Sequence, residues 1–321
     1  MAVYTKYNKE NIESILTNYS IGNLNAFKGI QEGIENTNYF LLVNNKKYIL
    51  TIYEKRVREE DLPFFAELMS GLNNANFKCP VPILNNNNPI TEFNKKKLMI
   101  VSFVEGKAKS ILNPEDCKSV GFEAAKMHEI TKNFKIKRQN DLSVNSWRKL
   151  FNSVKHQCIK IHKDLPKLIE SNLIDVESSW PKDLPQGIIH ADLFNDNIFF
   201  KENKFNGIID FYFSCTDFYA FEIAVCFNAL CFDGPQNNLS FNVTKAKKFI
   251  EGYNQIRKIT DEEKESIKVL SQGSALRFLL TRVFDSLNAV EGAVVKIKDP
   301  MEYLKRLEFH KNSRSSEDYF F

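Results

Sequence analysis

Four polar residues in one stretch of the chain have types and spacing that suit phosphate chemistry. Asp192 follows His190 by two positions, Asn197 lies five positions further on, and Asp210 follows after another thirteen. A short apolar run precedes each aspartate, so each carboxylate should extend from the end of a strand. We expect a β-hairpin between the two acids that returns the second beside the first.

This set of residues predicts ATP-dependent phosphoryl transfer to a small molecule. The hydroxyl group that attacks the γ-phosphate must be oriented in line by an acceptor, a role that suits Asp192. Mg²⁺ prefers hard oxygen ligands, and we expect these from the side-chain carbonyl of Asn197 and the carboxylate of Asp210. A preorganised charge cluster of this kind would supply most of the catalysis. We place His190 in the same catalytic segment.

Each of these residues also has an ordinary structural explanation when it is considered alone. His190 could be a hydrogen-bonded core histidine, Asp192 a helix cap and Asn197 a turn residue. Their combination with a second acid at a compatible distance, and with a strand-rich region upstream, favours the catalytic interpretation.

The expected secondary structure divides the chain into a strand-rich part and a helical part. Before the division we expect a helix, three strands, a second helix and a fourth strand, at 8–19, 23–31, 39–43, 47–53, 59–72 and 98–104. After it we expect helices over 113–133 and 145–178, short strands at 187–190, 198–201 and 205–209, and a helical remainder. The pattern predicts a two-lobed α+β fold, with an N-terminal nucleotide-covering lobe over 1–105 and a C-terminal catalytic lobe over 106–321.

The nucleotide is expected against the N-terminal lobe. Gly29 and Gly33 lie in a loop that runs to Asn38 between two candidate strands, where a phosphate-covering loop belongs, although a plain β-turn explains two glycines as well. The adenine should lie against the hinge at Phe103 and Val104, through main-chain groups that side-chain identity does not report.

Composition excludes several other classes of protein. The net charge of +4 over 321 residues is small, and basic and acidic residues are intermixed along the chain. Nothing in this pattern requires a nucleic acid partner. The longest apolar stretch, 218–232, is too short to span a bilayer, and the N-terminus lacks a targeting pattern. The six cysteines form no Cys-x-x-Cys pair, which predicts buried, reduced thiols in a cytoplasmic protein. The oligomeric state cannot be predicted.

The segment His-Ala-Asp-Leu-Phe-Asn-Asp-Asn at 190–197, followed by Ile-Asp-Phe-Tyr at 209–212, resembles the catalytic segment of the aminoglycoside phosphotransferase and choline kinase superfamily. That superfamily has a protein-kinase-like fold. More narrowly, stretches at 27–38, 48–54, 61–65 and 277–282 resemble the homoserine kinases within it. The resemblance implies transfer of the γ-phosphoryl group of ATP to the hydroxyl group of L-homoserine, a step in threonine biosynthesis. It implies that Asp192 is the catalytic base and that Asn197 and Asp210 bind the metal.

Two positions depart from the superfamily pattern. Thr51 stands where kinases of this fold usually carry a strand lysine that meets the α- and β-phosphates, and the homoserine kinases resemble this chain in having a threonine there. Glu222 stands where an aspartate usually braces the catalytic loop. Three cations lie near Thr51 in the sequence, and the choice among them stays open: Lys28, Lys55 and Arg56.

An amino-acid substrate requires a cation for its carboxylate and an acid for its ammonium group. Arg277 and Arg282 lie in an apolar helix, and either could bind the carboxylate in a bidentate manner or form a structural ion pair. For the ammonium group the candidates are Asp217, Asp233 and Glu35. Two other functions remain open: a kinase of another small alcohol, and a pseudokinase that binds nucleotide without turnover.

Overall fold

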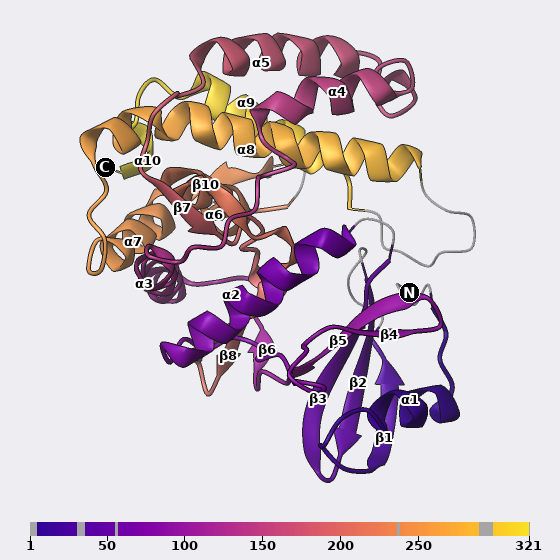
Figure 1. The fold of residues 1–321 in the computed structure, drawn as a ribbon. Helices are drawn as coiled ribbons and strands as arrows, with labels where there is room; N and C mark the ends of the chain where they lie inside the picture. The colour runs from indigo at the N-terminus through magenta and orange to yellow at the C-terminus, as the bar shows by residue number, and fades with distance from the viewer. Residues whose placement is uncertain (1–4, 31–35, 55–56, 236–237, 289–297, 321) are drawn as a thin grey trace. The chain divides into compact units, whose positions relative to one another are not determined.

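The computed structural model describes residues 5–30, 36–54, 57–235, 238–288 and 298–320 (Figure 1). These residues form two compact units, one within 5–106 and 206–212, the other within 107–205, 213–288 and 298–320. The first break follows Gly106, next to the expected division. Segment 206–212 groups with the first unit, although it lies in the range that we assigned to the C-terminal lobe.

The first unit is built on a five-stranded antiparallel sheet. Its strands are β1 (Leu24–Gly29), β2 (Thr37–Val43), β3 (Lys46–Ile52), β4 (Thr91–Phe93) and β5 (Lys96–Ser102), in the order β1-β2-β3-β5-β4. Burial alternates along β2, as a half-buried strand requires, and its inward residues pack with those of helix α1 (Lys9–Leu16). Asn44 and Asn45 both have positive φ, at 44° and 59°, which suits the two-residue turn between β2 and β3.

Helix α2 (Leu62–Asn74) follows a 3₁₀ turn at Glu59–Asp61, and both lie in the first unit. Segment 206–212 returns to this unit through close main-chain contacts. The Ile208 amide donates to the Lys78 carbonyl at 3.1 Å. Gly207 has φ of +153°, and a Cβ atom there would lie 2.9 Å from the same carbonyl oxygen. Only glycine fits this approach without a shift of the backbone.

The second unit is mainly helical, as expected. Its helices are α3 (Pro114–Thr131), α4 (Val144–Val154), α5 (Leu165–Ser179), α6 (Tyr219–Leu230), α7 (Val243–Tyr253), α8 (Asp261–Leu287), α9 (Met301–Asn312) and α10 (Glu317–Phe320). The long helix α8 packs against α4, α5, α6 and α9 (Figure 1). Capping boxes at Asn113 and Thr260 begin α3 and α8.

Short strands carry the candidate catalytic residues. In the second unit β7 (Gln186–Ile189) pairs antiparallel with β10 (Cys215–Phe218). Strands β6 (Lys107–Ala108), β8 (Ile198–Lys201) and β9 (Lys204–Ile208) form a three-stranded sheet with β8 in the middle, and the chain passes from one unit to the other within β9. The β8–β9 hairpin confirms the turn that we expected between the two acids.

Several features of the second unit differ from the sequence expectation, among them the short strand β6. The range 145–178 holds two helices separated by a 3₁₀ turn at Cys158–Lys160. Strand β10 lies where a helix was expected, because its main chain pairs with β7. Two further short strands, β11 (Phe232–Asp233) and β12 (Ser240–Phe241), pair with each other in the same part of the chain.

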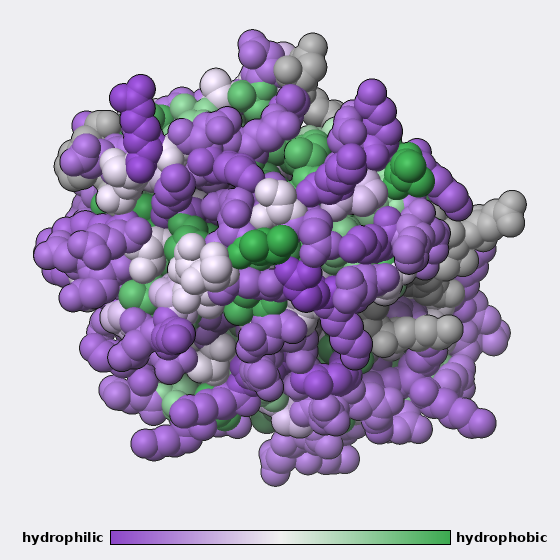
Figure 2. All heavy atoms as spheres, turned by 90° about the horizontal axis from the view of Figure 1, so that it is seen from above, coloured by the Kyte–Doolittle hydropathy of each residue, from purple (hydrophilic) through white to green (hydrophobic). Residues whose placement is uncertain are grey.

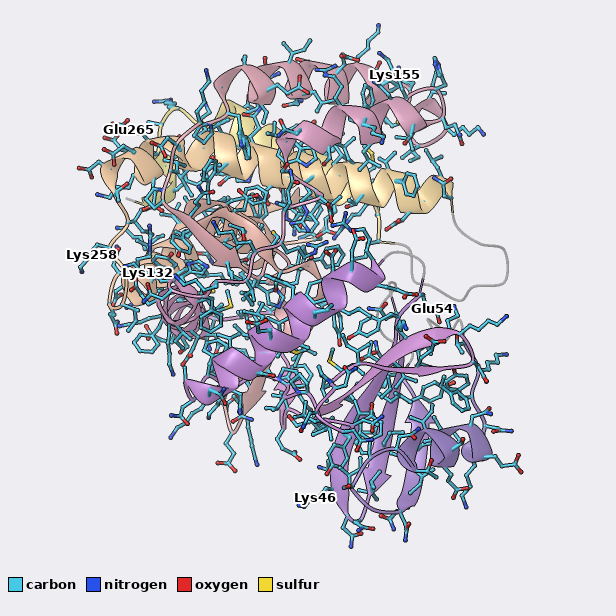
Figure 3. All side chains as sticks on the ribbon, in the orientation of Figure 1. Lys46, Glu54, Lys132, Lys155, Lys258 and Glu265 are labelled. Atoms are coloured by element: carbon cyan, nitrogen blue, oxygen red, sulfur yellow. The ribbon has the colours of Figure 1, made fainter. Side chains whose placement is uncertain are left out.

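A few large apolar side chains are exposed at separate positions: Leu84, Ile111, Ile159, Ile174 and Ile256. Figure 2 shows hydrophilic side chains over most of one face. Charged side chains such as Lys46, Lys155 and Glu265 extend outward from the ribbon in Figure 3. No helix among the described residues is long and apolar enough to cross a bilayer. All six cysteines are buried, as expected.

Candidate active site

The loop that carries the candidate base begins where strand β7 ends. His190, Ala191 and Asp192 follow Ile189 directly, and a 3₁₀ turn at Asn195–Asn197 leads into β8. Ala191 has φ of +64°, in the left-handed region that a residue with a Cβ atom rarely adopts. The chain therefore turns sharply one residue before Asp192.

The side chain of Glu222 contacts the main chain of this loop. It extends from the first turn of α6, is fully buried, and accepts hydrogen bonds from the main-chain amides of His190 and Ala191, the latter at 3.1 Å. Burial raises the pKa of Glu222 to about 7, against the opposing effect of the two amides. Through these two contacts Glu222 braces the main chain of the loop before Asp192.

Asp192 and Asn197 are joined by hydrogen bonds. The Asn197 amide nitrogen donates to the main-chain oxygen of Asp192 at 2.8 Å and to its carboxylate at 3.2 Å. Burial raises the pKa of Asp192 to about 6, while the charges of Arg277 and Lys298 lower it. Among the described residues nothing donates to the Asn197 side-chain oxygen, so that oxygen is available to a ligand.

His190 is fully buried within the same loop. Its Nδ1 atom accepts a hydrogen bond from the Asp192 amide at 3.3 Å, which requires the tautomer protonated on Nε2. Its ring thus contacts the main chain of the residue that we expect to act as base.

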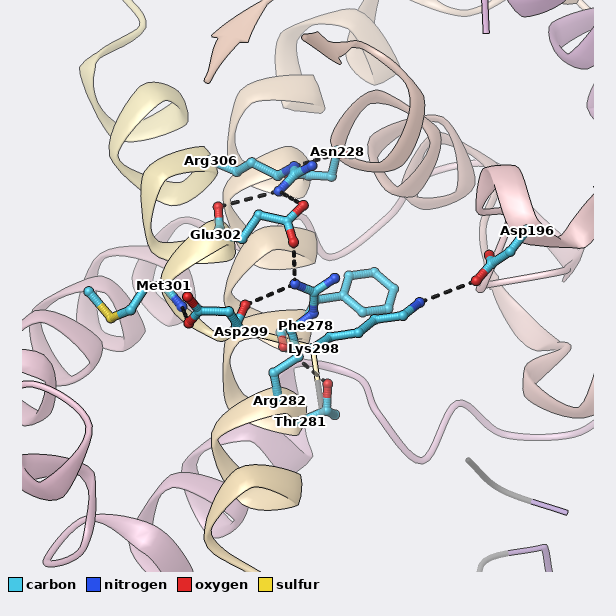
Figure 4. Close-up of polar contacts among 10 residues, drawn as sticks. All are labelled: Asp196, Asn228, Phe278, Thr281, Arg282, Lys298, Asp299, Met301, Glu302 and Arg306. Carbon is cyan, nitrogen blue, oxygen red and sulfur yellow. Dashed lines mark hydrogen bonds and ion pairs between the residues drawn. The ribbon is translucent and has the colours of Figure 1, made fainter. Parts of the chain in front are cut away.

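Arg277 and Arg282 both contact protein groups. Arg277, only 2% exposed, donates to the Ala191 carbonyl, and its guanidinium lies over the ring of Phe278. Arg282 donates to the main-chain oxygen of Asp299 at 3.0 Å and to the Glu302 carboxylate at 2.7 Å (Figure 4). The prediction that one of them binds a substrate carboxylate stays a prediction.

Sequence reasoning missed Lys298. Its ammonium group lies 3.3 Å from the Asp196 carboxylate in the catalytic loop (Figure 4) and 5.2 Å from the centre of the Phe194 ring. Its charge also lowers the pKa of Asp192. A lysine about a hundred positions from its partner carries no local signal that could have indicated this contact.

In the first unit, Thr51 stands where a strand lysine was considered, and the described residues that hydrogen-bond to it are uncharged. Thr51 on β3 stands opposite Asn38 on β2, and its hydroxyl donates to the Asn38 side-chain oxygen at 2.8 Å. The Tyr212 hydroxyl donates to Thr51 at 3.4 Å. Thr51 is only 2% exposed, so this chain of hydrogen bonds satisfies a buried hydroxyl. Tyr212 belongs to the motif that we quoted, but its type alone indicated no such role.

Asp210 lies in the first unit, where its charge acts on two buried tyrosines. Burial raises the pKa of both Tyr53 and Tyr212, and the charge of Asp210 raises each further. The two rings meet edge to face with centroids 5.2 Å apart. Asp210 has φ of +64°, so both candidate acids lie at or next to a residue with left-handed backbone.

The other candidates for nucleotide binding lie along the same sheet. Gly29 ends β1 opposite Tyr39, and Gly33 is outside the described residues. The Phe103 amide donates to the Lys47 carbonyl at 3.4 Å, and a Cβ atom on Gly207 would lie 2.8 Å from the Val104 side chain. Nothing in these contacts tests nucleotide binding.

Of the acids considered for a substrate ammonium group, two have partners within the second unit. Asp217 accepts from the Asn140 side chain at 2.6 Å. The Asp233 carboxylate accepts hydrogen bonds from the side chains of Lys245 and Asn242. Glu35, like Lys55 and Arg56, lies outside the described residues.

The two units together have a kinase-like fold, as comparison with solved structures shows. Among solved structures the chain is similar to an amicoumacin kinase, with a TM-score of 0.71 and 12% identity over 97% of this chain and 95% of that one. It is also similar to a choline kinase from Cryptosporidium parvum, with a TM-score of 0.66 and 17% identity over 97% and 96% of the two chains. At such low identity these likenesses show the fold.

A family model described as the phosphotransferase enzyme family matches residues 26–257, and the chain belongs to that family. Two homoserine kinases are similar to it over almost their whole length. One from Xanthobacter autotrophicus is 43% identical over 99% of both chains. One from Mesorhizobium japonicum is 41% identical over 99% of both chains. These comparisons confirm the resemblance to homoserine kinases.

Proposed function

We propose that this protein transfers the γ-phosphoryl group of ATP to the hydroxyl group of L-homoserine and releases O-phospho-L-homoserine. The observation that carries the proposal is the 43% identity to a homoserine kinase over 99% of both chains. A likeness that includes both ends of the chain extends well beyond the catalytic loop, so it supports the same acceptor as well as the same reaction.

Asp192 acts as the group that orients the acceptor hydroxyl and takes its proton. Its position in a sharply turned loop, braced by Glu222, supports this role because a base must be held in place to be effective. With a pKa of about 6, Asp192 is mostly ionised at neutral pH and can accept a proton. His190 contributes by holding the Asp192 amide.

Mg²⁺ is the metal that the donor groups suit. The Asn197 amide nitrogen donates to Asp192, which leaves the Asn197 side-chain oxygen for a hard cation. The carboxylate of Asp210 is a second oxygen ligand of the kind that Mg²⁺ prefers. When bound, the ion would neutralise charge on the β- and γ-phosphates. The hinge main chain around Phe103 and Val104, together with Gly29, Gly33 and Asn38, is proposed to contact the nucleotide.

The same proposal extends to the role of the protein in the cell. O-phospho-L-homoserine is formed in threonine biosynthesis, and we propose that the protein works there, in the cytoplasm. Arg277 or Arg282 would bind the substrate carboxylate if either leaves its present protein contact.

The acceptor can be identified with an ADP-release assay that compares L-homoserine with choline, serine, threonine and an aminoglycoside. We expect kcat/KM for L-homoserine to exceed that for each other alcohol by at least about tenfold, the factor that roughly 1.4 kcal/mol of differential binding supplies. Turnover of choline without turnover of homoserine would contradict the proposed acceptor. No turnover of any acceptor would favour a pseudokinase.

Replacing Asp210 with asparagine should raise the Mg²⁺ concentration needed for half-maximal rate by about tenfold or more, since one charged oxygen ligand becomes neutral. The measurement is the initial rate as a function of Mg²⁺ at fixed ATP. Asp261→Asn, an exposed acid at the start of α8, is the matched control and should leave the requirement unchanged. An unchanged Mg²⁺ dependence for Asp210→Asn would mean that the metal ligand has been misassigned.

A further inference from the structure

The backbone at Ala191 is held in a conformation that its side chain disfavours. Its φ of +64° places the Cβ atom close to the following carbonyl oxygen. Residues with left-handed backbone and a Cβ atom persist where their surroundings over-determine them, and they cluster at functional sites. Asp192, the proposed base, is the next residue.

Two buried charged side chains hold Ala191 from either side. Glu222 accepts the Ala191 N–H, and Arg277 donates to the Ala191 carbonyl. The first hydrogen bond orients the peptide plane before Ala191, and the second orients the plane after it. Rotation about the φ and ψ bonds of Ala191 is the only freedom between these planes. Together the two contacts therefore fix the backbone angles that aim Asp192.

Arg277 occupies this position at a cost to stability. It is almost fully buried, and burial lowers its pKa, while the charges of Asp192 and Glu222 raise it. Among the described residues its Nε atom has no hydrogen-bond partner. A buried guanidinium with an unsatisfied donor is weak evidence for a stabilising role, since apolar residues of similar volume often stabilise a fold better. Its one side-chain hydrogen bond within the described part of the chain is to the main chain beside the proposed base.

We propose that Arg277 is a positioning residue, which keeps Ala191 in its left-handed conformation and so aims the Asp192 carboxylate at the acceptor hydroxyl. This inference rests on the proposed function for the role of Asp192, but it does not depend on the identity of the acceptor. It assigns Arg277 to the main chain of the loop instead of to the substrate carboxylate.

The test is a double-mutant cycle between Arg277→Met and Ala191→Gly. We expect Arg277→Met to lower kcat by about 10²-fold, the loss that a misplaced catalytic group can cause, with KM values for ATP and acceptor within about threefold of wild type. Glycine adopts left-handed backbone without the Cβ penalty. In the Arg277→Met background, Ala191→Gly should therefore restore kcat by about tenfold, while in the wild-type background it should not raise kcat.

Arg306→Met is the matched control. Arg306 is also a buried arginine that donates to a main-chain carbonyl, that of Asn228, at 2.8 Å (Figure 4). Its removal should lower the melting temperature without a change in kcat for the folded enzyme, and it should show no coupling to Ala191→Gly. If Arg277→Met does not fold, Arg277→Lys takes its place in the cycle, because it keeps the charge but loses the guanidinium geometry.

The outcomes separate this inference from the proposed function. If the wild type is active and Ala191→Gly changes kcat by the same factor in the wild-type and Arg277→Met backgrounds, the inference is overturned. An Arg277→Met enzyme with normal kcat and a raised acceptor KM would also overturn it, because that result would assign Arg277 to substrate binding. A wild type inactive with L-homoserine would overturn the proposed function, and the cycle is then run with whichever alcohol is phosphorylated. For a protein without turnover, the same coupling is read in the free energy of unfolding, where additivity would overturn the inference.

Discussion

Replacing Asp192 with alanine should lower kcat by about 10²–10⁴-fold, the contribution that a positioned general base typically makes. The fold should change little. The carboxylate accepts only one side-chain hydrogen bond among the described residues, from Asn197, which also donates to the Asp192 main chain and keeps that contact in the variant. The measurement is kcat in the ADP-release assay together with the melting temperature.

Asp196→Asn is the control for this prediction. Asp196 lies in the same loop, but it is exposed and ion-paired with Lys298. Exposed ion pairs contribute little, about 0–1 kcal/mol, so this variant should keep both its stability and its activity. An Asp192→Ala enzyme with more than a tenth of the wild-type kcat would show that another group takes the proton.

Replacing Glu222 with alanine should destabilise the protein and abolish turnover together. The change leaves the amides of His190 and Ala191 buried without an acceptor, at about 1–3 kcal/mol for each unsatisfied group. Typical domains are stable by only about 5–15 kcal/mol. Urea unfolding followed by circular dichroism should therefore show a much lower midpoint, and the folded fraction should have little activity because its catalytic loop is no longer held.

Glu222→Gln separates the hydrogen bonds from the charge. Its amide oxygen can accept both main-chain amides, so we expect most of the stability to return. The pH dependence should then differ from that of wild type. Because the pKa of Glu222 in the fold is about 7, above its ordinary value of 4.5, its contribution to stability is present below pH 4.5 and is lost as the pH rises through 7.

Relative to Glu222→Gln, wild type should therefore lose up to about 3 kcal/mol of stability between pH 4.5 and pH 8, since each unit of pKa shift corresponds to about 1.4 kcal/mol. Urea unfolding at pH 5 and at pH 8 measures this difference. If wild type and Glu222→Gln differ in free energy of unfolding by the same amount at pH 5 and at pH 8, the raised pKa of Glu222 is contradicted. Equal stability of the alanine and glutamine variants would contradict the bracing role.

Local features of the fold could be predicted because their causes are local. The Asn44-Asn45 turn adopts the positive φ angles that asparagine tolerates, and Asn113 and Thr260 cap the helices that follow them. Periodicity likewise indicated helices α1 and α2 and strands β1, β2, β3 and β5 of the first unit. The catalytic motif was recognisable because its residues lie within one short segment.

Contacts between distant parts of the chain could not be predicted. Strand β10 forms because its main chain pairs with β7, and neither sequence alone indicates the other as its partner. For Arg277 the sequence left open a substrate carboxylate and a structural ion pair, since an arginine in an apolar helix needs an anionic or polar partner. Its partner is the main-chain carbonyl of Ala191, 86 positions earlier. This contact depends on how α8 packs against the loop, which the sequence around Arg277 does not indicate.

The return of segment 206–212 to the first unit affects how the polypeptide can be divided. The Tyr212 ring packs against Tyr53 and Phe65, and the Asn206 side chain donates to the Glu105 carbonyl at 2.7 Å. A polypeptide that stopped at residue 106 would lack this segment, and its aromatic side chains would lose their covering. The first 106 residues are therefore not a self-sufficient module that could be fused to another protein or exchanged with a relative by a single crossover.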